Sequence, residues 1–557
     1  MRPICRWYLS PLISVLAVAL ALSATAEAFG APVDVIGNLS TSDFNSYIAP
    51  QSYRDWGNEP CIAVNPANPQ QMIISTFGYG SWISSATAQL WYSTNGGASW
   101  AIAFSVPTPN GYGFFVDDQN YAYDSAGVLH GVILVQSSAG ALSVSHGSTT
   151  NVNSSAAWNW TSPAIASVNV DQPWIAISGA SVAVAYDNFN SGFTFSEERV
   201  AISTDNGATF GAALNRAVCS PGRVNTSIVN PGLRVAADAQ GDFFILCGVR
   251  TNNDISGVPL VNYRLNRYSA GSADWDFTTA SPDPIGALAI TNGSSRQGNN
   301  GSYSFGGINY LLGNTTAIAV NTNGSRVYVV YGLSDASTIG HLYLQKLVAS
   351  GTNLIKSGPA LALSSTNFSA ALPSVAVATN GTVAVLFDEF DGTNFHVRLA
   401  LSLDEGASIA ASGELYSFAT NGMVLGYGTT SHNRLLGDFA RMLANGNSFY
   451  GTFAGRGNVL SGNNNTTNFI VPFFFSLDVS VTQPTILSIA PIASDKVKID
   501  FGGSPGTTYY VQAATDLAPP IAWQTLSTNI ASISGQWSYT NLITGFPRRY
   551  YRASLAP

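Results

Sequence analysis

Ser93-Thr94-Asn95-Gly96-Gly97-Ala98-Ser99-Trp100 carries a pattern that recurs twice more in the chain and indicates a repeated fold. The other copies are Ser203-Thr204-Asp205-Asn206-Gly207-Ala208-Thr209-Phe210 and Ser402-Leu403-Asp404-Glu405-Gly406-Ala407-Ser408-Ile409. Each follows a strand-like run such as Gln89-Leu90-Trp91-Tyr92. The Asp or Asn can bond to its own backbone, the Gly can adopt a positive φ, and the large apolar residue can anchor the next strand. Each copy therefore predicts the tip of a β-hairpin.

The spacing of these copies indicates a repeated unit. Their first serines, Ser93, Ser203 and Ser402, are 203 − 93 = 110 and 402 − 203 = 199 residues apart. These intervals fit two and four repeats of about 50 residues. Openings made of a polar residue and a short Ala/Val/Ile run recur at Glu59, Asp118, Asp171, Asn230, Asn314, Leu372 and Gly437. They give seven candidate repeats between Asn58 and about Asp478.

The recurring pattern is the Asp-box, and on its three copies the chain resembles the sialidase-like, BNR-repeat β-propellers. The resemblance implies an all-β protein with a six- or seven-bladed propeller over residues 58–480. It also implies that the Asp-boxes lie on the face opposite the active site. The residues then expected to be structural are Ser93, Asn95, Gly97, Trp100, Ser203, Asp205, Gly207, Phe210, Ser402, Asp404 and Gly406.

The two ends of the chain differ from the repeats. Arg2 and Arg6, an apolar run from Leu9 to Leu22 and Ala26-Glu27-Ala28 predict a signal peptide over residues 1–28. We therefore expect a bacterial protein that is secreted, periplasmic or on the cell surface, with residues 29–57 as an N-terminal extension. Residues 484–557 contain short strands separated by turns, which predict a small β-sandwich like the modules on secreted bacterial proteins.

Composition excludes several classes of function. The pI is about 5.1 with no cluster of Lys and Arg, which argues against binding to nucleic acid. No run after the signal peptide is long and apolar enough to span a membrane. The histidines show no metal-ligand spacing, and no phosphate loop or dinucleotide motif is present. We therefore expect no cofactor and no metal, and a monomer whose partner is a glycan or an extracellular protein.

The three cysteines outside the signal peptide allow one disulfide at most within a molecule. Cys219 and Cys247 lie in consecutive segments and are the favoured pair. The alternative is that Cys61, Cys219 and Cys247 are all free thiols in the core.

The resemblance implies that blade openers and the ends of second strands meet at the functional face. Arg234, Glu59, Asp118 and Asp438 would bind ligand there together with Arg54 and Arg434, and Asp187, Arg250, Asp388, Glu389 and Arg456 would end second strands. Guanidinium groups grip carboxylates and acidic side chains accept hydroxyls, so this set suits an anionic or polyhydroxylated ligand. The structural alternative is that these side chains only join neighbouring blades.

Two functions are compatible with this set of residues at the functional face, where the central channel of the propeller would open. One is a secreted propeller that recognises a glycan or another extracellular ligand at its central mouth. The alternative is an exo-acting glycoside hydrolase of sialidase type that releases an acidic terminal sugar, with Arg54, Arg234 or Arg250, and Arg434 as its arginine triad. No Asp lies between Trp56 and Phe115, where the sialidase acid/base belongs. A different glycosidase would use Asp388 or Glu389 with Asp171 as catalytic residues.

Overall fold

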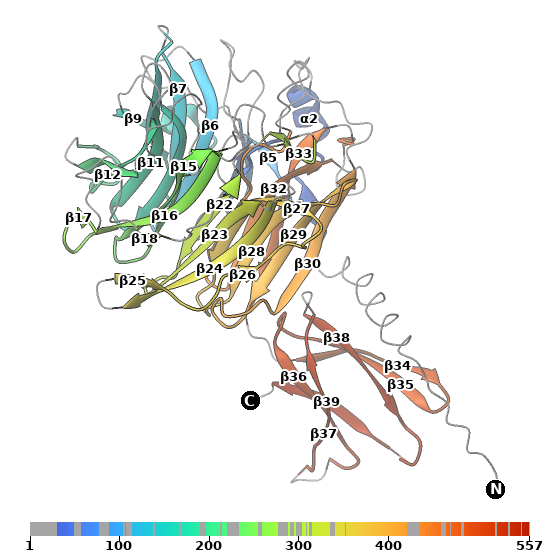
Figure 1. The fold of residues 1–557 in the computed structure, drawn as a ribbon. Helices are drawn as coiled ribbons and strands as arrows, with labels where there is room; N and C mark the ends of the chain where they lie inside the picture. The colour runs from blue at the N-terminus through green and yellow to red at the C-terminus, as the bar shows by residue number, and fades with distance from the viewer. Residues whose placement is uncertain are drawn as a thin grey trace. The chain divides into compact units, whose positions relative to one another are not determined.

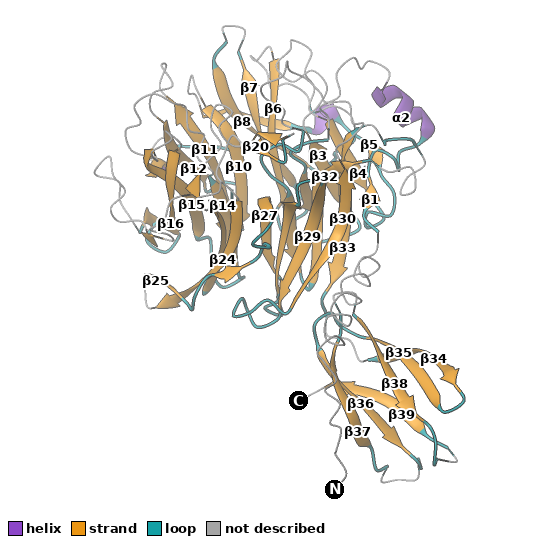
Figure 2. Cartoon of the chain, turned by 45° about the vertical axis from the view of Figure 1, so that its right-hand side comes forward, coloured by secondary structure: helices purple, strands orange, loops and turns teal. Residues whose placement is uncertain are grey.

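The computed structural model describes most of residues 31–555. The larger stretches outside the description are 1–30, 49–56, 77–88, 107–113, 190–195, 220–232, 254–258, 277–287, 290–294, 297–303, 335–339, 420–434 and 458–463, and the other gaps are at most four residues long. The described part is nearly all β-structure, which confirms the predicted class (Figure 1). Its helices are α2 (Thr41–Ile48) and the short 3-10 helix η1 (Ser155–Ala157), both drawn in purple in Figure 2.

The chain divides into two compact units, of which the larger holds residues 32–410 and 416–480. Within its described residues, six sheets follow one plan, with four strands in chain order. They are β2 (Cys61–Val64), β3 (Met72–Thr76), β4 (Gln89–Ser93) and β5 (Ala101–Ile102); β6 (Phe114–Tyr123), β7 (Leu129–Gln136), β8 (Leu142–Thr149) and β9 (Asn159–Ile165); β10 (Val170–Ser178), β11 (Ser181–Phe189), β12 (Ser196–Ser203) and β13 (Asn215–Cys219); β14 (Arg234–Ala237), β15 (Phe243–Asn253), β16 (Pro259–Ser269) and β17 (Asp274–Trp275); β22 (Thr316–Val320), β23 (Arg326–Ser334), β24 (Gly340–Ser350) and β25 (Asn353–Lys356); and β27 (Ser369–Val377), β28 (Val383–Phe390), β29 (Asn394–Ser402) and β30 (Ala411–Ala419).

A seventh sheet joins the two ends of this unit. It contains β31 (Arg441–Asn445), β32 (Ser448–Arg456) and β33 (Ile470–Asp478), and its fourth strand is β1 (Val33–Asp34) from the N-terminal extension. Val33 pairs with Phe474 and Asp34 with Phe473. The predicted boundary at Asn58 leaves this strand out, because two residues carry no recognisable strand pattern.

The first strands of the seven sheets form a ring. Each of β2, β6, β10, β14, β22 and β27 lies beside the next first strand, and β31 lies beside both β27 and β2. This closed arrangement of radiating four-stranded sheets is that of a β-propeller. Short strands supplement it: β18 (Leu288–Ala289) and β19 (Ser295–Arg296) pair with β16, β26 (Leu361–Ala362) pairs with β24, and β20 (Ser304–Phe305) pairs with β21 (Asn309–Tyr310).

Both faces of inner strands such as β11 and β28 are buried, which explains the continuous Ala/Val/Ile runs of the sequence. In β11, Ala183 and Ala185 pack in one apolar cluster with Val235 and Phe243 of the following sheet. The alternate residues of β11, among them Val184, pack in another cluster with strands of the preceding sheet. Small side chains on one face of β11 and larger ones on the other therefore fit this sheet between its two neighbours.

The three Asp-box hairpins share one geometry. In the second copy, Ser203 donates its hydroxyl to Asp205 Oδ1 at 2.6 Å, Gly207 N donates to Ser203 Oγ at 2.9 Å, and Thr209 N donates to Asp205 Oδ1 at 2.9 Å. The same three kinds of hydrogen bond occur at Ser93 and at Ser402. Each hairpin joins the third and fourth strands of its sheet, as the sequence predicts.

Strand register places these hairpins at one end of their sheets. Val64 at the end of β2 pairs with Met72, which pairs with Ser93. Equivalent pairings put Ser203 and Ser402 at the end where β10 and β27 finish. The polar blade openers, which precede or begin the first strands, therefore lie at the opposite end of each sheet.

The second compact unit includes residues 481–557. Its described strands form two three-stranded sheets, β34 (Thr485–Ala493), β35 (Lys496–Gly502) and β38 (Gln536–Leu542), and β37 (Gln524–Ile530), β36 (Thr508–Ala514) and β39 (Tyr550–Leu555). Side chains from both sheets meet in one core, where Trp537 stacks between Phe501 and Tyr509 with centroid distances of 5.2 and 4.6 Å.

Cysteine pairing is partly defined. Cys247 is disulfide-bonded, whereas Cys61 is a buried free thiol. The side chain of Cys219 lies outside the description, so its pairing with Cys247 stays a prediction.

Candidate functional site

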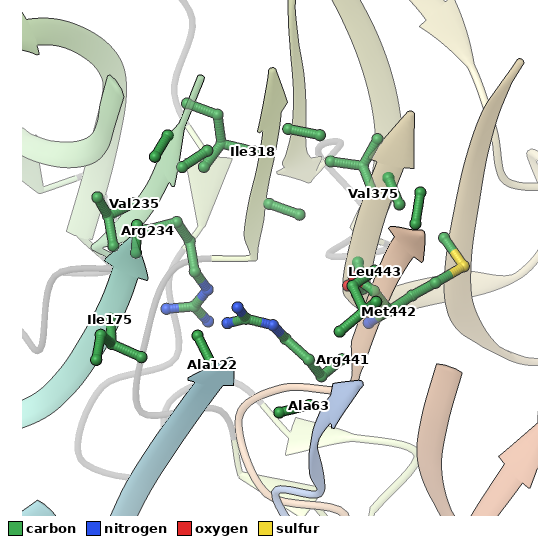
Figure 3. A pocket seen from close by; sticks show the side chains of 18 of the residues that line it. Ala63, Ala122, Ile175, Arg234, Val235, Ile318, Val375, Arg441, Met442 and Leu443 are labelled. Atoms are coloured by element: carbon green, nitrogen blue, oxygen red, sulfur yellow. The ribbon is translucent and has the colours of Figure 1, made fainter. Parts of the chain in front are cut away.

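All seven first strands line one cavity of about 340 Å³ in the larger unit. Most of its lining residues are apolar, such as Ala63, Ile175 and Val235, but polar and apolar atoms face the cavity in about equal measure. Among the described lining residues the charged side chains are Arg234 and Arg441, whose guanidinium groups point toward each other across the open space (Figure 3). The cavity is therefore a channel of mixed polarity with paired cations at the end where β14 and β31 begin.

Residues 435–441, which we call the crossing segment, lie across that end of the channel. Gln172 of β10 donates its side-chain amide to Asp438 Oδ2 at 3.0 Å. Phe439 packs edge-on against Trp174, with centroids 4.9 Å apart. The β10 and β31 sheets are not neighbours in the ring, because those that begin with β2 and β6 stand between them. The segment therefore bridges the channel mouth.

Buried polar side chains fix this segment. Asn309 is fully buried; its Oδ1 accepts hydrogen bonds from Leu436 N at 2.9 Å and Gly437 N at 3.0 Å, and its Nδ2 donates to Gly437 O at 2.8 Å. Glu59 accepts a hydrogen bond from Asp438 N at 3.1 Å. Gly437 has φ 76°, and a Cβ there would meet Glu59 Cγ at 2.0 Å. The corner thus requires glycine at this position.

In three of the blade openers, a residue with a left-handed backbone conformation directly precedes a proline. Glu59, Gln172 and Leu372 have φ values of 50°, 45° and 55° and precede Pro60, Pro173 and Pro373. Such conformations are costly for residues with side chains. At Asp171 and Ala371 the strand register also shifts, so the ladder is irregular at the openers of β10 and β27.

The two arginines share one aromatic ring. Arg234 Cζ lies 4.1 Å and Arg441 Cζ 5.3 Å from the centroid of Trp174. Arg234 also donates to its neighbour Leu233 O at 2.7 Å, and Arg441 donates to Asn120 Oδ1 at 3.3 Å. Among the described side chains neither arginine forms an ion pair within 4.0 Å. Burial lowers the pKa of Arg234 to about 10, with Asp438 favouring and Arg441 opposing its charge.

Three carboxyl groups lie in register beside this pair. Asp171 of β10 is opposite Asp187 of β11, and Asp187 is opposite Glu198 of β12. Asp187 and Glu198 are fully buried, whereas Asp171 is half-buried. Burial raises the pKa of both Asp187 and Glu198 well above the usual range of carboxyl groups, and the repulsion between neighbouring acids adds to this.

The structure brings together only part of the predicted ligand-binding set. Glu59, Arg234 and Asp438 meet at the mouth through the contacts given above. Asp118 is a half-buried residue of β6, within its irregular stretch between Phe115 and Gln119. Arg54 and Arg434 lie outside the described residues, so the predicted arginine triad stays a prediction.

The predicted catalytic residues are not gathered at one point. Asp171 belongs to the β10 sheet, whereas Asp388 and Glu389 belong to the β27 sheet, and the β14 and β22 sheets stand between them. Glu389 accepts a hydrogen bond from Ser365 N at 2.7 Å and lies 3.6 Å from Arg398 Nε. Asp388 is buried at the end of its own sheet, and burial raises its pKa well above the usual range. Pairing either residue with Asp171 would therefore require a substrate that spans the channel mouth.

Sequence reasoning missed Arg441, Trp174 and Glu198. Arg441 follows its opener Gly437 by four residues, as Arg234 follows Asn230, and each arginine begins the first strand of its sheet, so this shared spacing was a signal that could have found Arg441. Glu198 precedes the second Asp-box by five residues on a third strand, so only strand register shows that it faces Asp187.

Other site types are not found in the described part of the chain. It contains no group of three or more His, Cys, Asp or Glu side chains that could hold a metal ion. None of its helices is long and apolar enough to cross a membrane.

Comparisons with known proteins give only remote likenesses. No family model and no curated protein matches the sequence. A polysaccharide lyase, the PL25 ulvan lyase, is 9% identical with a TM-score of 0.43, over 80% of this chain and 97% of the lyase. An α-L-arabinanase from Penicillium chrysogenum is 12% identical with a TM-score of 0.41, over 81% and 98% of the two chains. An α-L-arabinofuranosidase from Fusarium graminearum is 11% identical with a TM-score of 0.40, over 67% and 98%. None of these likenesses is close enough to assign a function.

Proposed function

We propose that this protein is a secreted, seven-bladed β-propeller that binds the acidic end of a glycan in its central channel. Each of the seven sheets around the channel is then one blade, and β1 closes the ring. Residues 484–557 form a separate β-sandwich in this proposal, because the two three-stranded sheets share one core.

The observation that carries the proposal is the pair of arginines over Trp174. Two guanidinium groups that face each other repel, and among the described side chains no carboxylate lies in salt-bridge contact with either. An anion between them would remove this repulsion and could accept a forked pair of hydrogen bonds from each. The carboxylate of an acidic sugar is an anion that can accept these hydrogen bonds.

The rest of the channel suits a sugar ring. Its volume of about 340 Å³ falls at the lower end of the range for small-ligand pockets. Gln172, Asn120 and Asp438 provide amide and carboxyl groups near the arginines, and the ring of Trp174 supports both guanidinium groups. The ligand would therefore place its acid at the arginines and its apolar ring faces against the Ala, Val and Ile wall.

The test is a glycan array with matched acidic and neutral members, probed with the wild type and two variants. Arg441→Gln removes one cation of the mouth. Arg326→Gln is the matched control, because Arg326 pairs with Glu405 of the third Asp-box hairpin at 2.8 Å. The proposal predicts retention of acidic glycans by the wild type and Arg326→Gln and their loss with Arg441→Gln. Binding of neutral glycans alone, or equal binding by all three proteins, would overturn it.

A hydrolase that releases the acidic sugar is the second candidate. It is favoured by Asp171, a half-buried carboxyl group at the arginine end of the channel that lies in register with two buried acids. Such a hydrolase should release the fluorophore from 4-methylumbelliferyl sialoside or glucuronide, and Asp171→Asn should abolish release. Binding of the acidic glycan without any release from either compound would reject this candidate and leave the binding function.

A further inference from the structure

Asp187 and Glu198 form a buried pair of carboxyl groups beside an apolar cluster. They are direct cross-strand partners on β11 and β12, so their side chains project from the same face of the sheet, with Cβ atoms about 5 Å apart. That face is the one on which Ala185 and Val200 pack against the β14 sheet. Both residues have 0% exposure.

None of the four oxygens of the pair has a hydrogen-bond partner among the described residues. The amide of Gly248 on β15 comes close enough to favour charge on Glu198, without the geometry of a full hydrogen bond. Desolvated charges at this separation cannot both persist, because burial and mutual repulsion each disfavour ionisation. The pair therefore holds at least one proton.

The charged groups around the pair connect it with the mouth. Asp171 of β10 acts on Asp187, and Arg234 of β14 acts on both carboxyl groups. Arg234 in turn interacts with Asp438, Arg441 and Glu59. Glu197 and Arg199 bond to each other from alternate positions of β12, which project from its opposite face. The side chains of Arg250 and Cys219 lie outside the description.

We propose that Asp187 and Glu198 are a specificity-determining carboxyl pair, whose protonation decides how strongly the arginines of the mouth hold an anion. When the pair is ionised, it competes with the ligand for the charge of Arg234. When it is protonated, Arg234 is left to the ligand. Binding of an anion and binding of a proton to the pair then strengthen each other by the same factor.

This inference rests on the proposed function and predicts its pH dependence. The affinity for an anionic ligand should rise as the pH falls through the range in which the pair takes up its proton. Linkage of one proton to one ligand limits the rise to about tenfold per pH unit. Asp187→Asn and Glu198→Gln keep the shape of the side chains and remove their charge, so they should bind the anion tightly without this pH dependence.

The experiment is calorimetric titration of the full chain with 3′-sialyllactose between pH 5 and 8, in buffers of different ionisation enthalpy. We expect proton uptake on binding by the wild type and by Glu197→Gln, the control from the opposite face of β12, and none by Asp187→Asn/Glu198→Gln. If that double variant does not fold, Glu198→Gln alone should lower the proton uptake on binding to half of the wild-type value or less. Binding without proton uptake by the wild type would overturn the pair's role and leave the proposed function standing. The absence of any binding would overturn both.

Infrared spectroscopy tests the pair without a ligand. The wild type at pH 7 should show the C=O band of protonated buried carboxyl groups, and Asp187→Asn/Glu198→Gln should lose part of it. Asp388→Asn should remove a different part, because Asp388 is a buried acid of another sheet, the one that begins with β27. A band that does not change in the double variant would overturn the inference, whatever the ligand does.

Discussion

Gln172 donates its side-chain amide to a carboxylate oxygen of Asp438 at 3.0 Å, over a sequence separation of 266 residues. The bond reaches from the third sheet of the ring to the seventh, across the channel mouth. It is therefore one of the contacts that hold the crossing segment, which ends at Arg441, across the mouth beside Arg234.

Replacing Gln172 by Met should test this bond. The substitution keeps the length of the side chain and leaves Asp438 without this donor, and a lost hydrogen bond to a buried charged group costs about 1–3 kcal/mol. The measurement is the free energy of unfolding in urea at pH 7. Gln136→Met is the control, because the amide of Gln136 donates to Gly140 O at 3.2 Å on the surface, where the loss should stay within about 0.5 kcal/mol. Equal effects of the two variants would show that the bridge does not stabilise the mouth.

Gly207→Ala should destabilise the protein through a clash with a ring. Gly207 has φ 77°, and a Cβ there would lie 2.2 Å from His146 Cε1. The matched control is Gly179→Ala, with φ 56° and no atom within 4 Å, which should cost about 1–2 kcal/mol for the left-handed backbone alone. Overpacking should add about 1–3 kcal/mol at Gly207. Thermal and urea unfolding of both variants provide the comparison, and equal losses would refute the close packing of this Asp-box against His146.

The same contact recurs at the other Asp-boxes. A Cβ at Gly97 would meet Phe474 Cε1 at 2.0 Å, and one at Gly406 would meet Tyr328 Cε1 at 2.8 Å. Each Asp-box glycine thus packs on a ring of the preceding sheet. The sequence pattern predicts the turn, but the ring comes from a distant strand of different identity each time, which no local pattern shows.

Stability should fall in mild acid because of His146. Burial, helped by the neighbouring His130, lowers the pKa of His146 to about 3, whereas a histidine in the unfolded chain titrates near 6.5. The unfolded state therefore takes up the proton first. The stabilising contribution is complete above about pH 6.5 and is lost progressively as the pH falls toward about 3.

His146→Phe isolates this effect, since Phe474 fills the equivalent place beside Gly97. Between pH 7 and pH 5 the wild type should lose about 2 kcal/mol more than the variant in urea unfolding. Parallel pH profiles for the two proteins would mean that His146 is able to take up a proton in the folded state.

The fold was more predictable than the site for a physical reason. The hydrogen bonds of an Asp-box turn, such as those of Ser203, Asp205 and Gly207, join residues within a stretch of eight, so the turn can be recognised in the sequence. Closure of the ring by Val33 and Asp34, and the convergence of Arg234 with Arg441, depend on contacts between residues more than two hundred positions apart. The meeting of Glu59, Arg234 and Asp438 could be expected because openers share a place in each repeat. The contribution of Glu198 could not be expected, because it acts from a third strand.

The central claim is that Arg234 and Arg441 bind the carboxylate of an acidic sugar in the channel. The most direct measurement is the dissociation constant of 3′-sialyllactose and of lactose for the wild type and for Arg441→Gln, by calorimetry at pH 6. The wild type should prefer 3′-sialyllactose by about 1.5–3 kcal/mol, the range for charged hydrogen bonds, and Arg441→Gln should lose most of that preference while its unfolding midpoint is retained. An equal preference in both proteins, or equal affinity of the wild type for the two sugars, would contradict the claim.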